Sequence, residues 1–502
     1  MKKKNLLKER GAGVLLAISS LPSPYGIGTL GKAAYDFVDS LKQAGQTYWQ
    51  VLPIGPTSFG DSPYQSFSAF AGNPYFIDLD MLVEEKLLNV TDLAVYDWGS
   101  DPANVDYAAI YKNRYKVLEM AFERSKHESE SAYRSFVRKN AFWLEDYALY
   151  MSFKNYFKGE EWEKWPKEIR NRDKEVIAKY TDVLKKSIKF WKFVQYKFFT
   201  QFFELKKYAN KKGIYIIGDI PLYVSYDSSD VWSHPDQFQL DKNRRPSCVA
   251  GVPPDIFSED GQLWGNPIYD WKAMKKNGYK WWRQRMEMSA TFYDVIRIDH
   301  FIGIVNYWSI PAKAKKALYG KWVKGPGRKL TEVIKKSVGD SKIIAEDLGV
   351  ITPKVRKLID KMEWPGMKIL QFAFDGNPSN EYLPPNYSGT NYIVYGGTHD
   401  NDTWKGYLDS LKEYDLKYIR KYLNLSKEAT IEDYTDAMIR LGYMSVASTV
   451  IFQMQDLLCL DTKARMNFPS TIGTNWKYRM TDEKIPAEVI KKLKRNVKLY
   501  NR

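Results

Sequence analysis

Seven short apolar runs, with an eighth expected late in the chain, most constrain how this sequence can fold. They cover residues 14–18, 48–52, 214–217, 295–298, 343–345, 368–374 and 392–395, with the eighth at 450–454. Helix patterns lie between them; Ala34, Val38 and Leu41, for example, fall on one face of a predicted helix. Buried strands that alternate with helices indicate a parallel sheet covered on both faces. Eight such units predict an α/β fold, a (β/α)8 TIM barrel.

The spacing of the runs predicts large insertions into the barrel. About 160 residues separate the second run from the third, and about 75 separate the third from the fourth, whereas ordinary βα connections have about 2–6 residues. We therefore predict one catalytic barrel over residues 1–502 with a mainly helical insertion subdomain at 56–212. A second insertion is predicted at 220–292, and its segment 250–267 is expected to form a loop that covers the active site.

Charge and cysteine content exclude several classes of protein. Lys and Arg number 76 against 60 Asp and Glu, which gives a formal net charge of +16. The excess is spread over segments such as 185–192, 206–212, 313–329 and 491–495. We interpret these segments as solvated helix faces and predict no nucleic-acid partner. Cys248 and Cys459 are the only cysteines, which excludes a disulfide framework and a cysteine-built zinc site.

No membrane or nucleotide partner is predicted either. No apolar run approaches the roughly 18 residues of a membrane span, and the run at 14–18 is too short for a secretion signal, so a cytoplasmic protein is expected. The glycines of segment 26–31 match G-x-G-x-x-G, but the strand tip that should carry a ribose-binding acid has none before Asp61. Ala33 stands where a P-loop needs Ser or Thr. We interpret the glycines as a turn into the first barrel helix.

Acidic residues follow five of the predicted strands, at the end that carries the active site in barrel enzymes. These residues are Asp219, Asp299, Glu346 with Asp347, Asp375, and Asp400 with Asp402. A carboxylate beside an apolar strand costs several kcal/mol unless it is paired, hydrogen-bonded or functional. Any one of them could instead cap a helix or hold a loop, and for Asp347 and Asp375 this alternative stays open. Five strands that end in this way predict an active site lined by carboxylates.

Basic residues adjoin these acids. Two of the four histidines, His300 and His399, stand next to Asp299 and Asp400. Their spacing is not typical of metal ligands, so we predict no metal or cofactor and expect neutral histidines that hydrogen-bond a polyhydroxylated ligand. Arg297 precedes Asp299 by two residues and therefore lies on the same side of the strand. A cation in that place keeps the aspartate ionised, as a nucleophile requires.

Two carboxylates with different pKa values are what glycoside cleavage needs. One donates a proton to the leaving oxygen, while the other attacks or stabilises the sugar carbon. Sugar rings also have apolar faces that stack on aromatic side chains. Tyr64, Phe257 and Trp264 lie in predicted loops, where packing in the core is a weaker explanation for an aromatic residue. These features predict an enzyme that acts on glycans.

At this point a family resemblance becomes visible. It is carried by short motifs at 21–28, 62–66, 73–75, 218–224, 250–255, 261–267, 297–300, 344–349, 397–401, 465–469 and 475–476. In order and spacing, the chain resembles the 4-α-glucanotransferases of the α-amylase clan (amylomaltases or disproportionating enzymes), essentially from end to end. Each motif alone is weak, but together they are very specific.

The resemblance implies a role for each candidate residue. Asp299 would be the nucleophile, Glu346 the general acid and then base, and Asp400 the residue that stabilises the transition state. Asp219, Arg297 and His399 would hold the same sugar ring, and Tyr64 would stack on a glucose unit. The expected substrate-binding residues are Tyr64, Asp219, Asp255, Gln262, Trp264, Arg297, His300, Asp347, Asp375, His399 and Asn401.

The implied reaction is a retaining double displacement that transfers α-1,4-glucan segments to the 4-OH of an acceptor glucan or of glucose. The expected partners are maltooligosaccharides, amylose and glycogen-like polymers, with glucose as acceptor. The alternative is an α-amylase-like hydrolase, because both reactions share the covalent intermediate. A covered, partly dry acceptor site favours transfer, and the loop at 250–267 could provide that cover.

Overall fold

The computed structural model describes residues 5–58, 60–254, 259–349, 351–469 and 471–502. Its main sheet has eight parallel strands in the order β10-β11-β12-β1-β2-β3-β6-β9. They are β1 (Gly11–Leu15), β2 (Tyr48–Gln50), β3 (Tyr215–Pro221), β6 (Val295–Asp299), β9 (Lys342–Ala345), β10 (Gly366–Ile369), β11 (Tyr392–Tyr395) and β12 (Thr449–Gln453). The predicted barrel is therefore confirmed.

The barrel closes between β9 and β10 without a regular ladder. The backbone N–H of Ala345 donates to the carbonyl of Pro365 at 3.0 Å. The next bond across the seam is made by a side chain, because Oδ1 of Asp347 accepts from the backbone N–H of Met367 at 2.7 Å. The Asp347 carboxylate thus takes the place of a strand carbonyl. Asp347 therefore has a structural role, which is the alternative left open from the sequence.

Helices cover the barrel where the sequence pattern predicted them. They include α1 (Lys32–Gln43), α11 (Lys280–Phe292), α12 (Arg328–Ser337), α13 (Pro353–Met362), α14 (Trp404–Ser410), α15 (Glu413–Tyr422), α16 (Ile431–Met444) and α18 (Ala487–Leu499). Helix α1 buries Ala34, Val38 and Leu41, as expected. Its first residue follows Gly31, at which a Cβ would overlap the carboxylate of Asp78. The glycine motif therefore shapes the entry into α1, as interpreted.

One strand prediction was wrong. The apolar run 368–374 is a strand only as far as Ile369, and Leu370–Phe372 forms a 3-10 turn. Leu370 and Ala373 are apolar because they are buried in this turn, not because a strand continues. Asp375 consequently does not end a strand. It is exposed in a loop, where its carboxylate accepts from the backbone N–H of Asn377 at 2.9 Å.

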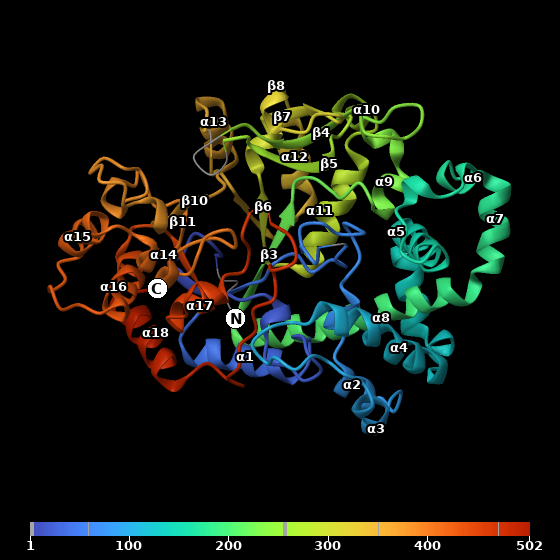
Figure 1. Cartoon of the computed structure of the whole chain (residues 1–502), viewed down its shortest axis with the longest axis horizontal. Helices are drawn as coiled ribbons and strands as arrows, with labels where there is room; N and C mark the ends of the chain where they lie inside the picture. The colour runs from blue at the N-terminus through green and yellow to red at the C-terminus, as the bar shows by residue number, and fades with distance from the viewer. Residues whose placement is uncertain (1–4, 59, 255–258, 350, 470) are drawn as a thin grey trace.

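The first insertion is helical and lies on one side of the barrel (Figure 1). It comprises α2 (Leu79–Glu84), α3 (Val90–Ala94), α4 (Tyr107–Arg124), α5 (Ser131–Tyr156), α6 (Lys167–Arg170) and α7 (Lys174–Val183). Helix α8 (Lys185–Lys212) belongs to both parts, since it packs on α5 in the insertion and on α1 and β3 of the barrel. Aromatic side chains fill this interface; Phe199, for example, stacks on Trp143 with ring centroids 5.7 Å apart.

A second, antiparallel sheet has the order β5-β4-β7-β8 and lies beyond the carboxyl ends of β3 and β6 (Figure 1). Its strands are β4 (Cys248–Val252), β5 (Gln262–Pro267), β7 (Asn306–Pro311) and β8 (Lys321–Lys324). The first two follow β3, whereas the other two follow β6. The interpretation of 313–329 as a helix face was therefore wrong up to residue 327, because pairing with β7 makes 321–324 a strand and the α-helix begins only at Arg328.

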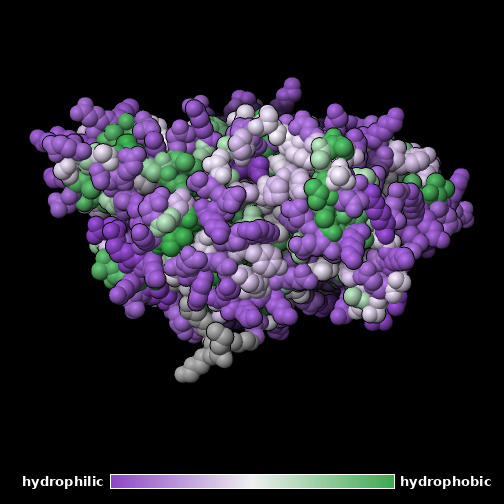
Figure 2. Space-filling view, turned by 90° about the horizontal axis from the view of Figure 1, so that it is seen from below, coloured by the Kyte–Doolittle hydropathy of each residue, from purple (hydrophilic) through white to green (hydrophobic). Residues whose placement is uncertain are grey.

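The protein surface fits the lysine-rich composition. The face drawn in Figure 2 is mostly hydrophilic, and apolar side chains appear there in small separate patches. Within the described part of the chain, no helix is long and apolar enough to cross a lipid bilayer.

Candidate active site

Arg297 stands at the centre of the predicted carboxylate cluster. Strand β6 pairs with β3 so that Asp219 lies opposite Arg297, and Asp299 shares the Arg297 side of β6. Nη1 of Arg297 donates to Oδ1 and Oδ2 of Asp219 at 2.8 and 2.6 Å. Nη2 of Arg297 lies 2.8 Å from Oδ1 of Asp299. One buried guanidinium therefore holds two carboxylates from adjacent strands.

Electrostatics explain why this group stays charged. Burial alone would lower the pKa of Arg297, but the charges of Asp219 and Asp299 hold it well above its ordinary value. Burial raises the pKa of Asp219, although the positive charge of Arg297 acts against it. Asp299 is the more accessible carboxylate, because its side chain is 26 % exposed whereas that of Asp219 is fully buried. Asp299 thus combines a fixed cation with access for a ligand.

Glu346 follows β9 and occupies a different environment. The residue is only 7 % exposed. Its Oε2 accepts from the backbone N–H of His300 at 2.6 Å, and its Oε1 accepts from that of Leu348 at 2.7 Å. Burial, and then the negative charge of Asp299, raise the pKa of Glu346 from 4.5 to about 8, against the opposing charge of Arg297. Glu346 is therefore mostly protonated at neutral pH and can donate a proton.

Asp400 lies in the loop after β11 and is held ionised. Nε2 of His399 is 3.4 Å from Oδ2 of Asp400, and Nδ2 of Asn467 donates to Oδ1 at 2.6 Å. Desolvation by the surrounding protein acts to raise the pKa of Asp400, but the His399 charge and these hydrogen bonds lower it to about 2. Burial likewise acts to lower the pKa of His399, and the charge of Asp400 outweighs it, so that pKa is raised. The two side chains form an ion pair.

Tyr64 joins the two halves of the cluster. Its hydroxyl donates to Oδ2 of Asp219 at 2.8 Å and lies 2.9 Å from Nδ1 of His399. Its ring stacks on the His399 imidazole with centroids 4.4 Å apart, and the Trp476 ring lies at 5.7 Å. Because the hydroxyl donates to Asp219, Nδ1 of His399 must donate to the same hydroxyl. Both ring nitrogens of His399 then carry protons, in agreement with its raised pKa, so the expectation of a neutral histidine was wrong for His399.

The antiparallel sheet β5-β4-β7-β8, called the small sheet below, also borders the cluster. Trp264 of β5 meets the His300 ring edge-on at 4.8 Å, and its indole N–H donates to Oε1 of Gln262 at 3.1 Å. Burial lowers the pKa of His300 to about 4, so this histidine is neutral. Its buried Nε2 has no hydrogen-bond partner among the described residues. A ligand hydroxyl could satisfy this atom.

The structure brings ten of the predicted residues together. They are Tyr64, Asp219, Gln262, Trp264, Arg297, Asp299, His300, Glu346, His399 and Asp400. Asn401 uses its Oδ1 within its own loop, where it accepts from the backbone N–H of Thr398 at 2.8 Å. Asp347 closes the barrel, and Asp375 lies in an exposed loop. Asp255 and Phe257 lie outside the described residues.

The segment 465–476 supplies contacts that sequence reasoning missed. Asn467 and Trp476 contact Asp400 and Tyr64, and the Arg465 guanidinium donates to the carbonyl of Asp400 at 2.5 Å. The sequence signals were the motifs at 465–469 and 475–476, to which no role was assigned, because this segment does not end a strand.

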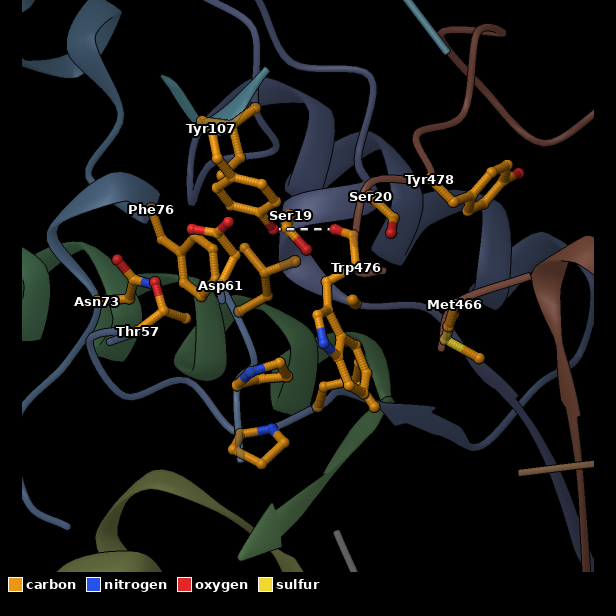
Figure 3. A pocket seen from close by; sticks show the side chains of 16 residues that line it. Ser19, Ser20, Thr57, Asp61, Asn73, Phe76, Tyr107, Met466, Trp476 and Tyr478 are labelled. Carbon is orange, nitrogen blue, oxygen red and sulfur yellow. Dashed lines mark hydrogen bonds between the residues drawn. The ribbon is translucent and has the colours of Figure 1, made fainter. Parts of the chain in front are cut away.

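Two hollows lie near the cluster, one beside Trp476 and one beside Tyr64. One, of about 520 Å³, is lined by Asp61, Tyr107 and Trp476, and the Tyr107 hydroxyl donates to the Trp476 carbonyl at 2.9 Å (Figure 3). The other, of about 580 Å³, reaches Tyr64 and Asp219. Within the described residues, no group of three or more His, Cys, Asp or Glu is arranged to hold a metal ion. The second hollow thus gives the cluster open space beside Tyr64 and Asp219.

Comparisons with known proteins agree with this chemistry. The family model of 4-alpha-glucanotransferase matches residues 16–484. A 4-alpha-glucanotransferase of Clostridium butyricum is 49 % identical over 97 % of this chain and 99 % of its own, and one of Thermus thermophilus is 43 % identical over 95 % and 96 %. The amylomaltase of Streptococcus agalactiae, solved in complex with acarbose, is 42 % identical and superimposes with a TM-score of 0.94, covering 98 % of this chain and all of its own. The chain therefore belongs to the 4-α-glucanotransferase family and is a glycosyltransferase that acts on α-1,4-glucans.

Proposed function

We propose that the chain transfers α-1,4-glucan segments by a retaining double displacement, with Asp299 as nucleophile, Glu346 as acid and base, and Asp400 as electrostatic stabiliser. One observation carries this assignment. Glu346 is buried, with its pKa raised to about 8, whereas Asp299 pairs with a buried cation at 2.8 Å. A proton donor and an anionic nucleophile thus stand at neighbouring strand ends, as glycoside cleavage with retention requires.

The first step forms a glycosyl-enzyme. A carboxylate oxygen of Asp299 attacks C1 of the donor sugar while the bond between C1 and the glycosidic oxygen breaks. The proton of Glu346 passes to that oxygen, and the shortened glucan leaves with a new 4-OH. Glu346 is now a carboxylate. Because Asp299 is esterified at this stage, its negative charge no longer raises the pKa of Glu346, whose burial still favours the uptake of a proton in the second step.

The second step reverses the first with a new partner. The 4-OH of an acceptor glucan or of glucose gives its proton to Glu346 and attacks C1, and the bond to Asp299 breaks. The ionised Asp400 stabilises the positive charge that develops on the sugar in both steps. Asp219, Arg297 and His399 hold the ring between them, while His300 and Trp264 border it from the small sheet.

Maltotriose separates transfer from the alternative, hydrolysis. In transfer, glucose and longer oligosaccharides appear while the number of reducing ends stays constant. In hydrolysis by an α-amylase-like enzyme, the number of reducing ends rises with time. We expect a product ladder with constant reducing ends. The Asp299→Asn variant is expected to lose this activity, and full activity in that variant would overturn the assignment of the nucleophile.

A further inference from the structure

An exposed group of apolar side chains lies on the small sheet, away from the acid cluster. It consists of the exposed Trp322 on β8, the exposed Leu318 and Tyr319 in the turn before it, and the half-buried Trp308 on β7, and we name it the outer aromatic patch. Tyr319 is 65 % exposed and Trp322 44 % exposed. Large exposed aromatic side chains that gather in one place mark a binding surface more often than scattered ones do.

The patch is rigid. Trp308 and Trp322 are direct cross-strand partners, and their rings meet edge-on with centroids 5.2 Å apart. The Trp308 indole N–H donates to the carbonyl of Ala317 at 2.8 Å, which fixes the start of the turn. Gly320 packs against the same indole so closely that a Cβ there would overlap it. The rings are therefore held in place before any ligand arrives, which lowers the entropy that binding costs.

The sheet connects this patch to the active site. Side chains alternate along β5, so that Trp264 reaches His300 on one face while Leu263 is exposed on the other. Leu263 pairs with Gly251, Gly251 with Trp308, and Trp308 with Trp322, so these residues form one row across the outer face. Three strand spacings, about 14 Å, separate the two ends of this row. Gly251 in the middle of this row is buried, so a chain that leaves the active site over β5 would meet the exposed Leu263, pass over the covered middle of the row and then reach the patch.

The surrounding charges also favour a sugar polymer. Lys313, Lys315, Lys321 and Lys324 are exposed in the same segment of the chain as the rings, and Lys316 pairs with Asp260 at 2.9 Å. Ammonium groups at the rim can donate to hydroxyls, while flat rings in the centre match the apolar face of a pyranose. A polyanion would bind the lysines but would not need the rings. The centre of the patch is apolar, and its most exposed ring carries a hydroxyl.

We propose that the outer aromatic patch binds a distant part of the same α-glucan chain whose other part occupies the active site. This proposal rests on the proposed function, because it names a second contact for the same substrate. A second weak contact on one chain raises the apparent affinity for that chain through effective concentration. Donors too short to reach both places, such as maltotriose, gain nothing from it. The patch therefore sets a preference for long donors without touching the chemical step.

Two substitutions and one control test this proposal. Trp322→Ala and Tyr319→Ser each remove one ring, and Tyr414→Ala removes a 77 % exposed ring from α15, outside the patch. Migration in native gels that contain amylose measures binding, and initial rates on amylose and on maltotriose measure catalysis. Retardation by amylose should weaken in both patch variants, and their apparent KM for amylose should rise about fivefold, as removal of one aromatic contact predicts. Rates on maltotriose, and all properties of Tyr414→Ala, should stay unchanged.

Other outcomes overturn the proposal. Unchanged retardation of both patch variants would exclude glucan binding at this place. Binding to heparin that falls steeply with salt and is lost in Trp322→Ala, without any effect of amylose, would assign the patch to a polyanion. A dimer that dissociates on the same substitution would assign it to a second copy of the chain. If Trp322→Ala unfolds at a lower temperature than the unaltered protein, the proposal is judged on the results for Tyr319→Ser. Absence of maltotriose transfer by the unaltered protein would refute the proposed function, whereas the gel comparison tests the patch alone.

Discussion

Glu346 should make the folded protein less stable as the pH rises, and Glu346→Gln should remove this effect. Burial and the charge of Asp299 raise its pKa from 4.5 to about 8. The folded state therefore holds the proton more tightly than the unfolded state does. The stability that this group contributes is complete below about pH 4.5 and is lost as the pH rises through about 8.

The magnitude follows from the two pKa values. The difference between 4.5 and about 8 corresponds to about 5 kcal/mol once the pH exceeds both values. Between pH 4.5 and pH 7, the native protein should lose about 3 kcal/mol of unfolding free energy through this one residue. In Glu346→Gln the side chain cannot titrate. The amide keeps one acceptor for the N–H groups of His300 and Leu348 and loses the other, at a cost that does not depend on pH.

Urea denaturation followed by tryptophan fluorescence, at constant ionic strength from pH 4.5 to pH 8, measures this difference. The unfolding free energy of Glu346→Gln relative to the native protein should rise by about 3 kcal/mol between pH 4.5 and pH 7. Glu381→Gln is the matched control. Burial acts to raise the pKa of Glu381, but hydrogen bonds and charge from Lys368 and Arg356 lower it from its ordinary value of 4.5. The stability that this group contributes is therefore lost only as the pH falls below about 4.5, so the difference between Glu381→Gln and the native protein should stay nearly constant across this range. A constant difference between Glu346→Gln and the native protein across this range would refute the reasoning.

Three further predictions concern catalysis and the barrel seam. On maltotriose, kcat/KM should fall as the pH rises through about 8, because Glu346 loses the proton that it donates; a rate that stays constant up to pH 9 would contradict this role. Tyr64→Phe should keep the ring stacked on His399 but lower the unfolding free energy by about 2 kcal/mol, since hydrogen bonding to charged groups in the folded protein is lost; urea denaturation at pH 7 would show it. Asp347→Ala should lower the unfolding free energy by about 1–3 kcal/mol, because the Met367 N–H loses its acceptor, whereas Asp347→Asn should lose less; urea denaturation at pH 7 compares them.

The barrel and most of its acid cluster could be predicted from the sequence. Strands covered by helices on both faces must be apolar along their length, so a short apolar run marks each strand in the sequence. A carboxylate directly after such a strand, as in Asp219 and Asp299, is expensive enough to require a reason. Parallel strands also end on the same side of a barrel, which brings Asp299 and Glu346 together although 46 residues of sequence separate them.

Tertiary structure alone decided which acids joined that cluster. Asp347 and Asp375 follow apolar runs just as Asp299 does, yet one closes the barrel through Met367 and the other caps its own loop. The contacts of Asn467 with Asp400, and of β8 with β7, join segments that no local pattern links. Burial on both faces makes each barrel strand apolar along its length, so the strand is visible in the local sequence. The partner of a hydrogen bond depends on which segments meet in space, and that is settled only when the whole chain has folded.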